Sequence, residues 1–323
     1  MNGRERITVN HGRRTRREIV KTVLGGAAGL LLGAPARRLV AAPAQGAPAG
    51  ARADVERLAD DLFVVRVPGE ANVVAHTGAG GTTLVDGASA GGSEALLLAI
   101  EDLPGSGPVE TLFNTHWHPE QTGSNARLRA AGATVIAHEN TRLWLTTDLT
   151  WPWNGRRFEP LPADARPTET FYSRGELPSG VQYGYIPDAA HTDGDLYVYF
   201  PEQDVLAVGD AVSGDGWPLV DWPTGGWIGG IVGGLERLQS LAGQQTRIVP
   251  GRGPVLARAD LETQLEMYGT IQERLTRLLN TGRSPDEAVA ERPAQEFEVQ
   301  MGSSDEFVRR AFESLWAYLS PDA

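Results

Sequence analysis

The chain has 323 residues, of which 41% are hydrophobic and 22% charged, a composition typical of a packed globular protein. It contains no cysteine, so disulfides, thiolate metal sites and cysteine nucleophiles are excluded, and any metal must be bound by His, Asp or Glu. The net charge is −12, divided between +7 in residues 1–50 and −19 in the remainder. The acidic remainder argues against nucleic acid or anionic membranes as partners, and solubility is the simpler interpretation of its charge.

The first 50 residues have the pattern of an export signal. Arg16 and Arg17 precede an apolar run from Val23 to Ala34, and small residues follow near Ala42. The run has 12 residues, whereas a spanning helix needs about 20, so we expect no stable membrane anchor. The paired arginines resemble a twin-arginine signal, which implies the twin-arginine export machinery as a partner and a periplasmic or extracellular location. The alternative is a flexible basic tail. Residues 51–323 are expected to form a single domain.

The first half of this domain alternates short strands with helices. Runs of alternating or continuous apolar residues, separated by glycines, predict the strands, and an apolar face predicts each helix. We expect strands at 62–67, 72–76, 82–85, 109–114 and 134–137, and helices at 91–103, 125–131 and 139–145.

The second half repeats this order after an aperiodic stretch, residues 150–180, which is rich in Pro and Trp and predicts a long surface loop. We expect strands at 181–186, 196–200, 205–208 and 247–249, and helices at 229–241, 260–280 and 304–319. Two halves of similar order predict an α/β domain with two sheets face to face and helices outside.

Two histidines follow the apolar strand 109–114 one residue apart, at His116 and His118. In an extended segment their side chains point the same way, so both imidazoles can face one ion. A lone His-x-His is a weak signal, but its place at the end of a sheet, where sites are commonly built, strengthens it. His191 lies between two later strands.

Two aspartates end apolar strands. Asp210 follows the strand at 205–208, a position typical of either a metal ligand or a turn cap. Asp86 has the same position after Val85, and we expect it to orient a neighbour rather than to bind metal.

Four motifs together resemble the metallo-β-lactamase superfamily. They are His116-Trp-His118-Pro-Glu120, His191-Thr-Asp-Gly-Asp, Val208-Gly-Asp210 and Ile248-Val-Pro-Gly-Arg252. Their order and spacing carry the resemblance over nearly all of residues 55–270. The resemblance implies a four-layer αββα sandwich, a metal site at the edge between the sheets, and a hydrolase that uses a zinc-bound water. It also implies His116, His118 and His191 as zinc ligands, with Asp210 able to join them.

The sequence departs from the family pattern at three positions. Glu120 replaces the aspartate and Gln121 the last histidine of His-x-His-x-Asp-His, and Arg252 replaces the histidine of Pro-Gly-His-Gly. The three-histidine site is therefore complete, whereas the second metal site keeps Asp210, with Glu120 as its one further candidate ligand, so we expect one zinc ion rather than two. Gln121 and Asp86 are expected to support the site without binding the ion.

The altered residues suggest roles in catalysis. Glu120 is a candidate to orient the water or carry a proton, and Asp210 to act beside it. Arg252 is expected to replace the second ion and pair with Asp210, Glu120 or both. It is also a candidate to bind a substrate carboxylate or a developing oxyanion. His76 and His138 are expected to lie outside the site.

Three functional interpretations remain open: a mononuclear hydrolase, a dinuclear enzyme with unusual ligands, and a non-catalytic exported binding module on the same fold. The substrate is expected to be a small molecule with an ester, amide, lactam or thioester bond, and the protein a monomer or weak oligomer. Tryptophans near the loops predict either an apolar or ring-containing substrate or simple cover for loop backbone. They are Trp117, Trp151, Trp153, Trp217, Trp222 and Trp227.

Overall fold

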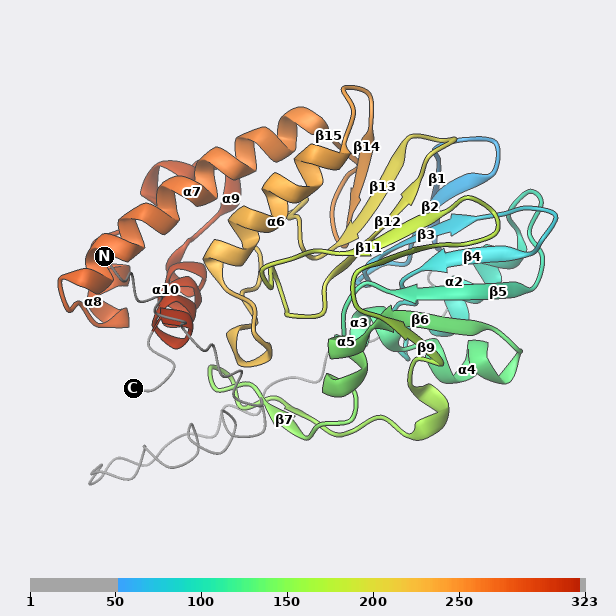
Figure 1. Ribbon diagram of the computed structural model, residues 1–323, viewed down its shortest axis with the longest axis horizontal. Helices are drawn as coiled ribbons and strands as arrows, with labels where there is room; N and C mark the ends of the chain where they lie inside the picture. Colours follow the sequence, from blue (N-terminus) through green and yellow to red (C-terminus); the bar gives the residue numbers. More distant parts are fainter. Residues whose placement is uncertain (1–51, 320–323) are drawn as a thin grey trace, which may run out of the picture. The chain divides into compact units, whose positions relative to one another are not determined.

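Short runs rich in Val, Leu and Ile build two β-sheets that face each other in the computed structural model, which describes residues 52–319 (Figure 1). The predicted signal in residues 1–50 lies outside the described residues. The first sheet has the strand order β1-β2-β3-β4-β5-β6-β9. Its strands are β1 (Asp54–Arg57), β2 (Leu62–Arg66), β3 (Asn72–His76), β4 (Thr82–Val85), β5 (Val109–Asn114), β6 (Thr134–His138) and β9 (Glu169–Phe171). It is antiparallel from β1 to β4 and parallel from β4 to β9.

The second sheet has the strand order β10-β11-β12-β13-β14-β15, and within it only β13 and β14 run parallel. Its strands are β10 (Arg174–Glu176), β11 (Gln182–Tyr185), β12 (Leu196–Phe200), β13 (Val205–Gly209), β14 (Arg247–Pro250) and β15 (Leu256–Ala257). The chain enters it directly from the first sheet, because β9 and β10 are separated by only two residues.

Alternation along each strand divides the apolar side chains between separate cores. In β2, Leu62 and Val64 pack between the two sheets, whereas Phe63 and Val65 pack beneath helices on the outer face. Helices α2 (Ser93–Glu101) and α4 (Asn125–Ala130) cover the first sheet, and α6 (Ile228–Leu241) and α7 (Arg258–Asn280) cover the second (Figure 1). Helix α10 (Asp305–Leu319) packs against α6 and α7. The predicted αββα sandwich is confirmed.

The prediction for residues 150–180 was wrong in part. This stretch contains β9 and β10, which extend one edge of each sheet. It also holds part of a separate hairpin, β7 (Leu149–Thr150) with β8 (Arg157–Phe158), and a 3-10 turn at Ala163–Ala165. Strands of two or three residues are too short to show a period, which is why the sequence did not predict them. Trp151 in this stretch is buried against Trp117 rather than exposed at the surface.

Short helices complete the described part of the chain: α3 (Pro119–Thr122), α5 (Glu139–Trp144), α8 (Pro285–Ala290) and α9 (Glu298–Met301), with 3-10 turns at Trp222–Thr224 and Gln295–Phe297. Within residues 52–319, no helix combines the length and apolar character needed to cross a membrane.

Candidate metal centre

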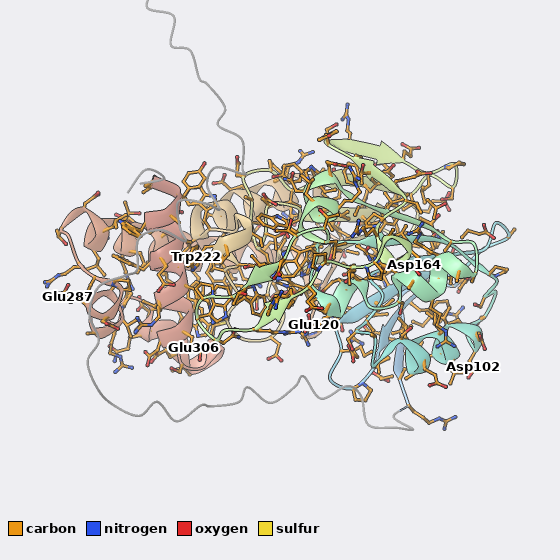
Figure 2. All side chains as sticks on the ribbon, turned by 90° about the horizontal axis from the view of Figure 1, so that it is seen from below. Asp102, Glu120, Asp164, Trp222, Glu287 and Glu306 are labelled. Atoms are coloured by element: carbon orange, nitrogen blue, oxygen red, sulfur yellow. The ribbon has the colours of Figure 1, made fainter. Side chains whose placement is uncertain are left out.

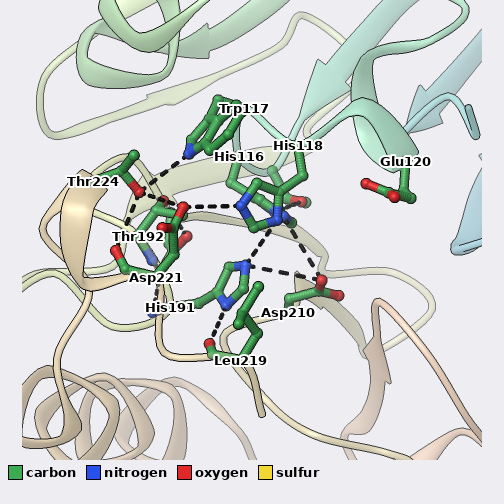
Figure 3. Close-up of polar contacts among 12 residues, drawn as sticks. His116, Trp117, His118, Glu120, His191, Thr192, Asp210, Leu219, Asp221 and Thr224 are labelled. Carbon is green, nitrogen blue, oxygen red and sulfur yellow. Dashed lines mark hydrogen bonds and ion pairs between the residues drawn. The ribbon is translucent and has the colours of Figure 1, made fainter. Parts of the chain in front are cut away.

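Strand ends from both sheets deliver four potential ligands to one place (Figure 3). His116 and His118 follow the carboxyl end of β5, and α3 begins immediately after them. His191 lies in the loop between β11 and β12, and Asp210 directly follows β13. One ligand atom from each of these residues lies within 4.8 Å of all the others. The structure therefore brings together all four residues that the sequence suggested as ligands.

The closest approaches identify the atoms that converge. His118 Nδ1 lies 3.1 Å from His191 Nε2. Asp210 Oδ2 lies 3.7 Å from His116 Nε2 and 3.9 Å from His191 Nε2. Zinc–nitrogen bonds of ~2.0–2.1 Å in a tetrahedral site place ligand atoms roughly 3.3 Å apart, so a metal ion of this size fits among these atoms after small side-chain shifts.

Hydrogen bonds on the far sides of the rings fix the tautomer of each histidine. His191 Nδ1 lies 2.6 Å from the carbonyl oxygen of Leu219, which only accepts, so this nitrogen carries the proton. His118 Nε2 lies 3.0 Å from the carboxylate oxygen Oδ2 of Asp221 and donates to it in the same way. The lone pairs of His191 Nε2 and His118 Nδ1 consequently face each other, which is repulsive without a cation between them.

The tautomer of His116 is fixed in the same way, by a hydrogen bond to Thr115. The Thr115 hydroxyl donates to the carboxylate of Asp86, 2.8 Å from Oδ2, so its oxygen accepts from His116 Nδ1 at 3.1 Å. His116 Nε2 is left with its lone pair in the cluster, buried and without a hydrogen-bond partner. A buried nitrogen of this kind is unfavourable unless something binds it. The residues present therefore fit a metal ion.

The electrostatics also favour the metal-binding form of His116. Burial lowers its pKa well below the ordinary value, and repulsion from Arg252, and from His118 or His191 whenever either is protonated, lowers this pKa further. A neutral imidazole at neutral pH is the form that binds zinc.

Asp221, which accepts from His118, was not predicted from the sequence. It is fully buried, and its carboxylate also accepts from Trp151 Nε1 at 3.1 Å and Thr224 Oγ1 at 2.6 Å. Trp117 Nε1 donates in turn to Thr224 Oγ1 at 3.2 Å. Two of the loop tryptophans thus hold the carboxylate that orients a ligand. No spacing or periodicity marks Asp221, because it lies in an irregular loop 103 residues after His118.

Asp86 lies behind the site in a strained loop position. Its φ is +67°, and both the backbone N–H and the hydroxyl of Thr115 donate to its carboxylate. Burial raises the pKa of Asp86, and the nearby charge of Asp210 adds to this, while the hydrogen bonds from Thr115 oppose it. A side chain at Gly209, whose φ is +54°, would overlap Thr115, so glycine lets β13 reach this point. The geometry places Asp86 behind His116, where the sequence analysis expected an orienting residue.

A cavity of about 210 Å³ opens beside the cluster. Its lining includes His118, Glu120, Trp151, Asp210, Trp217 and Arg252. The floor is thus the candidate metal centre, and the lining carries indole rings, the three carboxylates of Glu120, Asp210 and Asp215, and a guanidinium.

The predicted pairing of Arg252 with Asp210 or Glu120 was wrong. Arg252 is exposed on the cavity rim, and no ion pair links it to either carboxylate in the described structure. The cation beside Glu120 is instead Arg156, whose Nη1 lies 3.6 Å from Glu120 Oε1. The Arg156 guanidinium also lies 4.7 Å from the centre of the Phe158 ring. Sequence reasoning missed Arg156 because it lies in the stretch that was predicted to be a surface loop.

Gln121 is fully buried, and neither polar atom of its side chain has a hydrogen-bond partner. The other two histidines of the folded part lie elsewhere: His76 Nε2 is 3.3 Å from Asp61 Oδ2, and His138 caps the start of α5.

The loop that carries Arg252 is fixed to the first sheet by Asn72, at the start of β3. Its side-chain Nδ2 donates to the carbonyl oxygens of Pro250 and Gly253, at 2.9 and 3.0 Å, and its backbone N–H donates to that of Gly251 at 2.7 Å. A side chain at Gly251 would overlap the Asp210 carboxylate, so this glycine allows the loop to close over the site.

Comparisons with known proteins agree with this geometry. The family model described as the metallo-β-lactamase superfamily matches residues 66–283. Among solved structures, the DIM-1 metallo-β-lactamase is similar with 20% identity and a TM-score of 0.54, over 68% of this chain and 98% of that one. A metallo-β-lactamase from Pontibacter korlensis is similar with 20% identity and a TM-score of 0.54, over 68% of this chain and 99% of that one. At this identity the two structures establish a shared fold.

Proposed function

Because the chain belongs to the metallo-β-lactamase superfamily, we propose that it is a zinc-dependent hydrolase with one metal ion per chain. The observation that carries the proposal is the convergence of three histidine lone pairs on one point beside an open cavity. Each lone pair is directed there by a hydrogen bond on the opposite side of its ring. His116, His118 and His191 would hold the ion, with Asp210 at its edge.

A bound zinc ion supplies Lewis acidity and, at neutral pH, a nucleophile derived from water. Glu120 and Asp210 line the cavity, where a carboxylate can take up a proton and return it to a leaving group. Arg252 places a permanent positive charge on the rim, suited to a negative group of the substrate or to charge that develops during reaction. Trp151 and Trp217 offer apolar surface to the remaining part of a bound substrate.

One ion is favoured over two by the residues in the second position. Glu120 lies beside Arg156, Gln121 has no imidazole, and Arg252 offers no lone pair. A dinuclear site would have to rely on Asp210 and Glu120 alone.

The reaction class we propose is hydrolysis of an ester, amide, lactam or thioester bond in a small molecule. The solved relatives are named as β-lactamases, which makes a β-lactam one candidate for this cavity. The ion pair between Glu120 and Arg156 favours a second candidate, a binding module that uses the same pocket without turnover, because it engages the carboxylate available for proton transfer.

Export through the twin-arginine machinery, to the periplasm or beyond, forms part of the proposal. The paired arginines and the apolar run of residues 1–50 support it. Replacing Arg16 and Arg17 with lysines should retain the protein in the cytoplasm on cell fractionation. Unchanged export would reject this part alone.

The enzymatic proposal is tested by screening the zinc-loaded protein against lactam, lactone, ester and thioester panels, beside His116→Ala. We expect hydrolysis of at least one class by the unmodified protein and its loss in the variant. Zinc binding without turnover of any panel member would favour the binding module.

A further inference from the structure

Four of the six loop tryptophans contact residues of the C-terminal part of the described chain, and none of these four forms a ring contact or a hydrogen bond with the three histidines of the cluster. We call residues 284–319, which follow the family match, the C-terminal segment, and residues 211–227, which follow Asp210, the site loop. Trp217, Trp222 and Trp227 belong to the site loop, and each contacts the C-terminal segment. Trp153, from the neighbouring hairpin, lies 5.7 Å from the guanidinium of Arg310 on α10.

The first contact is at Trp217. Its ring stacks on Phe307 at 4.7 Å with planes 15° apart, and its Nε1 donates to the carbonyl oxygen of Gly302 at 2.9 Å. At the other end of the loop, Trp227 stacks on Tyr318 at 3.7 Å with planes 6° apart.

The middle contact is a hydrogen bond. Trp222 Nε1 donates to Glu313 Oε2 at 3.1 Å. Figure 2 labels Trp222 beside the C-terminal helices, which are drawn in red. Just beyond the loop, the N–H of Ile228 donates to Ser314 Oγ at 3.2 Å. Three indoles of the site loop therefore contact successive positions of α10 and of the turn that precedes it.

Two of the three acceptors that fix the histidine rings lie in the site loop between these contacts. Leu219, whose carbonyl fixes His191, lies two residues after Trp217. Asp221, whose carboxylate fixes His118, directly precedes Trp222. A shift of Trp222 would therefore move Asp221 relative to His118.

We propose that the C-terminal segment positions the metal ligands, with Glu313 as the main positioning residue, by holding Asp221 and Leu219 at hydrogen-bonding distance from His118 and His191. The inference rests on the proposed function, since it requires that the cluster bind zinc. It also identifies what Trp217, Trp222 and Trp227 do: they dock a helical addition that lies outside the family match onto the loop behind the metal site.

The hydrogen bond between Trp222 and Glu313 is not needed merely to attach α10 to the rest of the protein. Phe307, Phe312 and Leu315 already anchor α10 in the core beneath the second sheet. Glu313 is partly buried, and burial raises the pKa of its carboxyl group. A partly buried carboxylate is unfavourable unless it is hydrogen-bonded, and the indole of Trp222 supplies that bond.

The test compares Glu313→Leu with Glu306→Leu, which makes the same change at an exposed position of the same helix. Glu313→Gln keeps an oxygen that accepts from Trp222 and serves as the conservative rescue. The readouts are the zinc dissociation constant, from competition with a chromophoric chelator, and the absorption spectrum of the cobalt-substituted protein. Removing the hydrogen-bond partner of a metal-binding residue weakens metal binding ~10–100-fold. Glu313 contacts Trp222 and not the histidine's partner Asp221 itself, so we expect a loss of about tenfold in zinc affinity for Glu313→Leu. Glu306→Leu and Glu313→Gln should bind zinc and absorb like the unmodified protein.

The inference is overturned if Glu313→Leu binds zinc normally with an unchanged cobalt spectrum, even when its melting temperature falls. If that variant does not fold, Trp222→Phe removes the Nε1–H donor while it keeps an aromatic ring, and the same two readouts decide. Absence of zinc binding by the unmodified protein would instead reject the proposed function and, with it, this inference. Normal binding by the unmodified protein and both variants rejects the inference alone.

Discussion

Asp221 accepts a hydrogen bond from His118 at 3.0 Å and thereby determines which nitrogen of that histidine faces the other ligands. The carboxylate is fully buried and is held by three donors, His118, Trp151 and Thr224. A carboxylate behind a metal-binding histidine fixes the ring and makes it a stronger ligand. This contact joins the two strand-end motifs to the site loop, and several predictions depend on it.

Replacing Asp221 with asparagine keeps the shape of the side chain and removes its charge. We expect zinc affinity to fall ~10–100-fold, because the ligand loses a charged acceptor. Asp164→Asn is the control, since Asp164 is exposed, lies outside the cavity lining and should leave affinity unchanged. Chelator competition measures both, and equal affinities in the two variants would contradict the assigned role of Asp221.

Gly251→Ala should disturb the site without touching a ligand directly. The new methyl group would overlap the Asp210 carboxylate, so Asp210 or the loop must move. We expect weaker zinc binding and altered cobalt spectra. Gly269→Ala, in the middle of α7 with open space around it, should keep normal zinc binding and stabilise the fold by ~1 kcal/mol. A normal zinc affinity and spectrum in Gly251→Ala would show that the close approach is unimportant.

Restoring the two histidines of the family pattern, at positions 121 and 252, tests whether their absence is the reason that only one metal ion binds. Arg252→His alone should still bind one zinc, because Gln121 supplies no imidazole. Gln121→His combined with Arg252→His provides two more nitrogen donors and should bind a second equivalent. Elemental analysis counts the metal in each protein. A second tight equivalent in the unmodified chain would contradict the mononuclear account.

Glu313→Gln should change the pH dependence of stability in a defined direction. Burial raises the pKa of Glu313 in the folded protein, so its contribution to stability is present below the unfolded pKa and is lost as pH rises through the folded pKa. Glutamine does not ionise, so the variant does not lose this stability as the pH rises. The free energy of unfolding of the variant minus that of the unmodified protein should therefore be larger at pH 8 than at pH 4. Urea unfolding at the two pH values measures the difference, and an opposite trend would mean that the charged form is favoured by folding.

The regular elements and the ligand cluster were predictable because strong local signals mark them. Strands β3, β4, β5 and β12 begin and end at the predicted residues, since short runs rich in apolar and β-branched residues define them. His116 and His118 were found through their two-residue spacing after such a run.

The supporting residues were not predictable, because tertiary contacts alone define them. Asp221 and the carbonyl of Leu219 reach the histidines from an irregular loop, and Arg156 reaches Glu120 from a hairpin with two-residue strands. The expected partnership of Arg252 failed for a related reason: the chain supplies a closer cation for Glu120 that no local pattern indicates.

The central claim is that three histidines hold one zinc ion, and metal content tests it most directly. The purified protein, equilibrated with zinc and freed of loosely bound metal, should contain one equivalent per chain. His116→Ala should lose it, whereas His76→Ala, which alters a histidine paired with Asp61 outside the cluster, should retain it. No tightly bound zinc in the unmodified protein, or full retention by His116→Ala, would contradict the account.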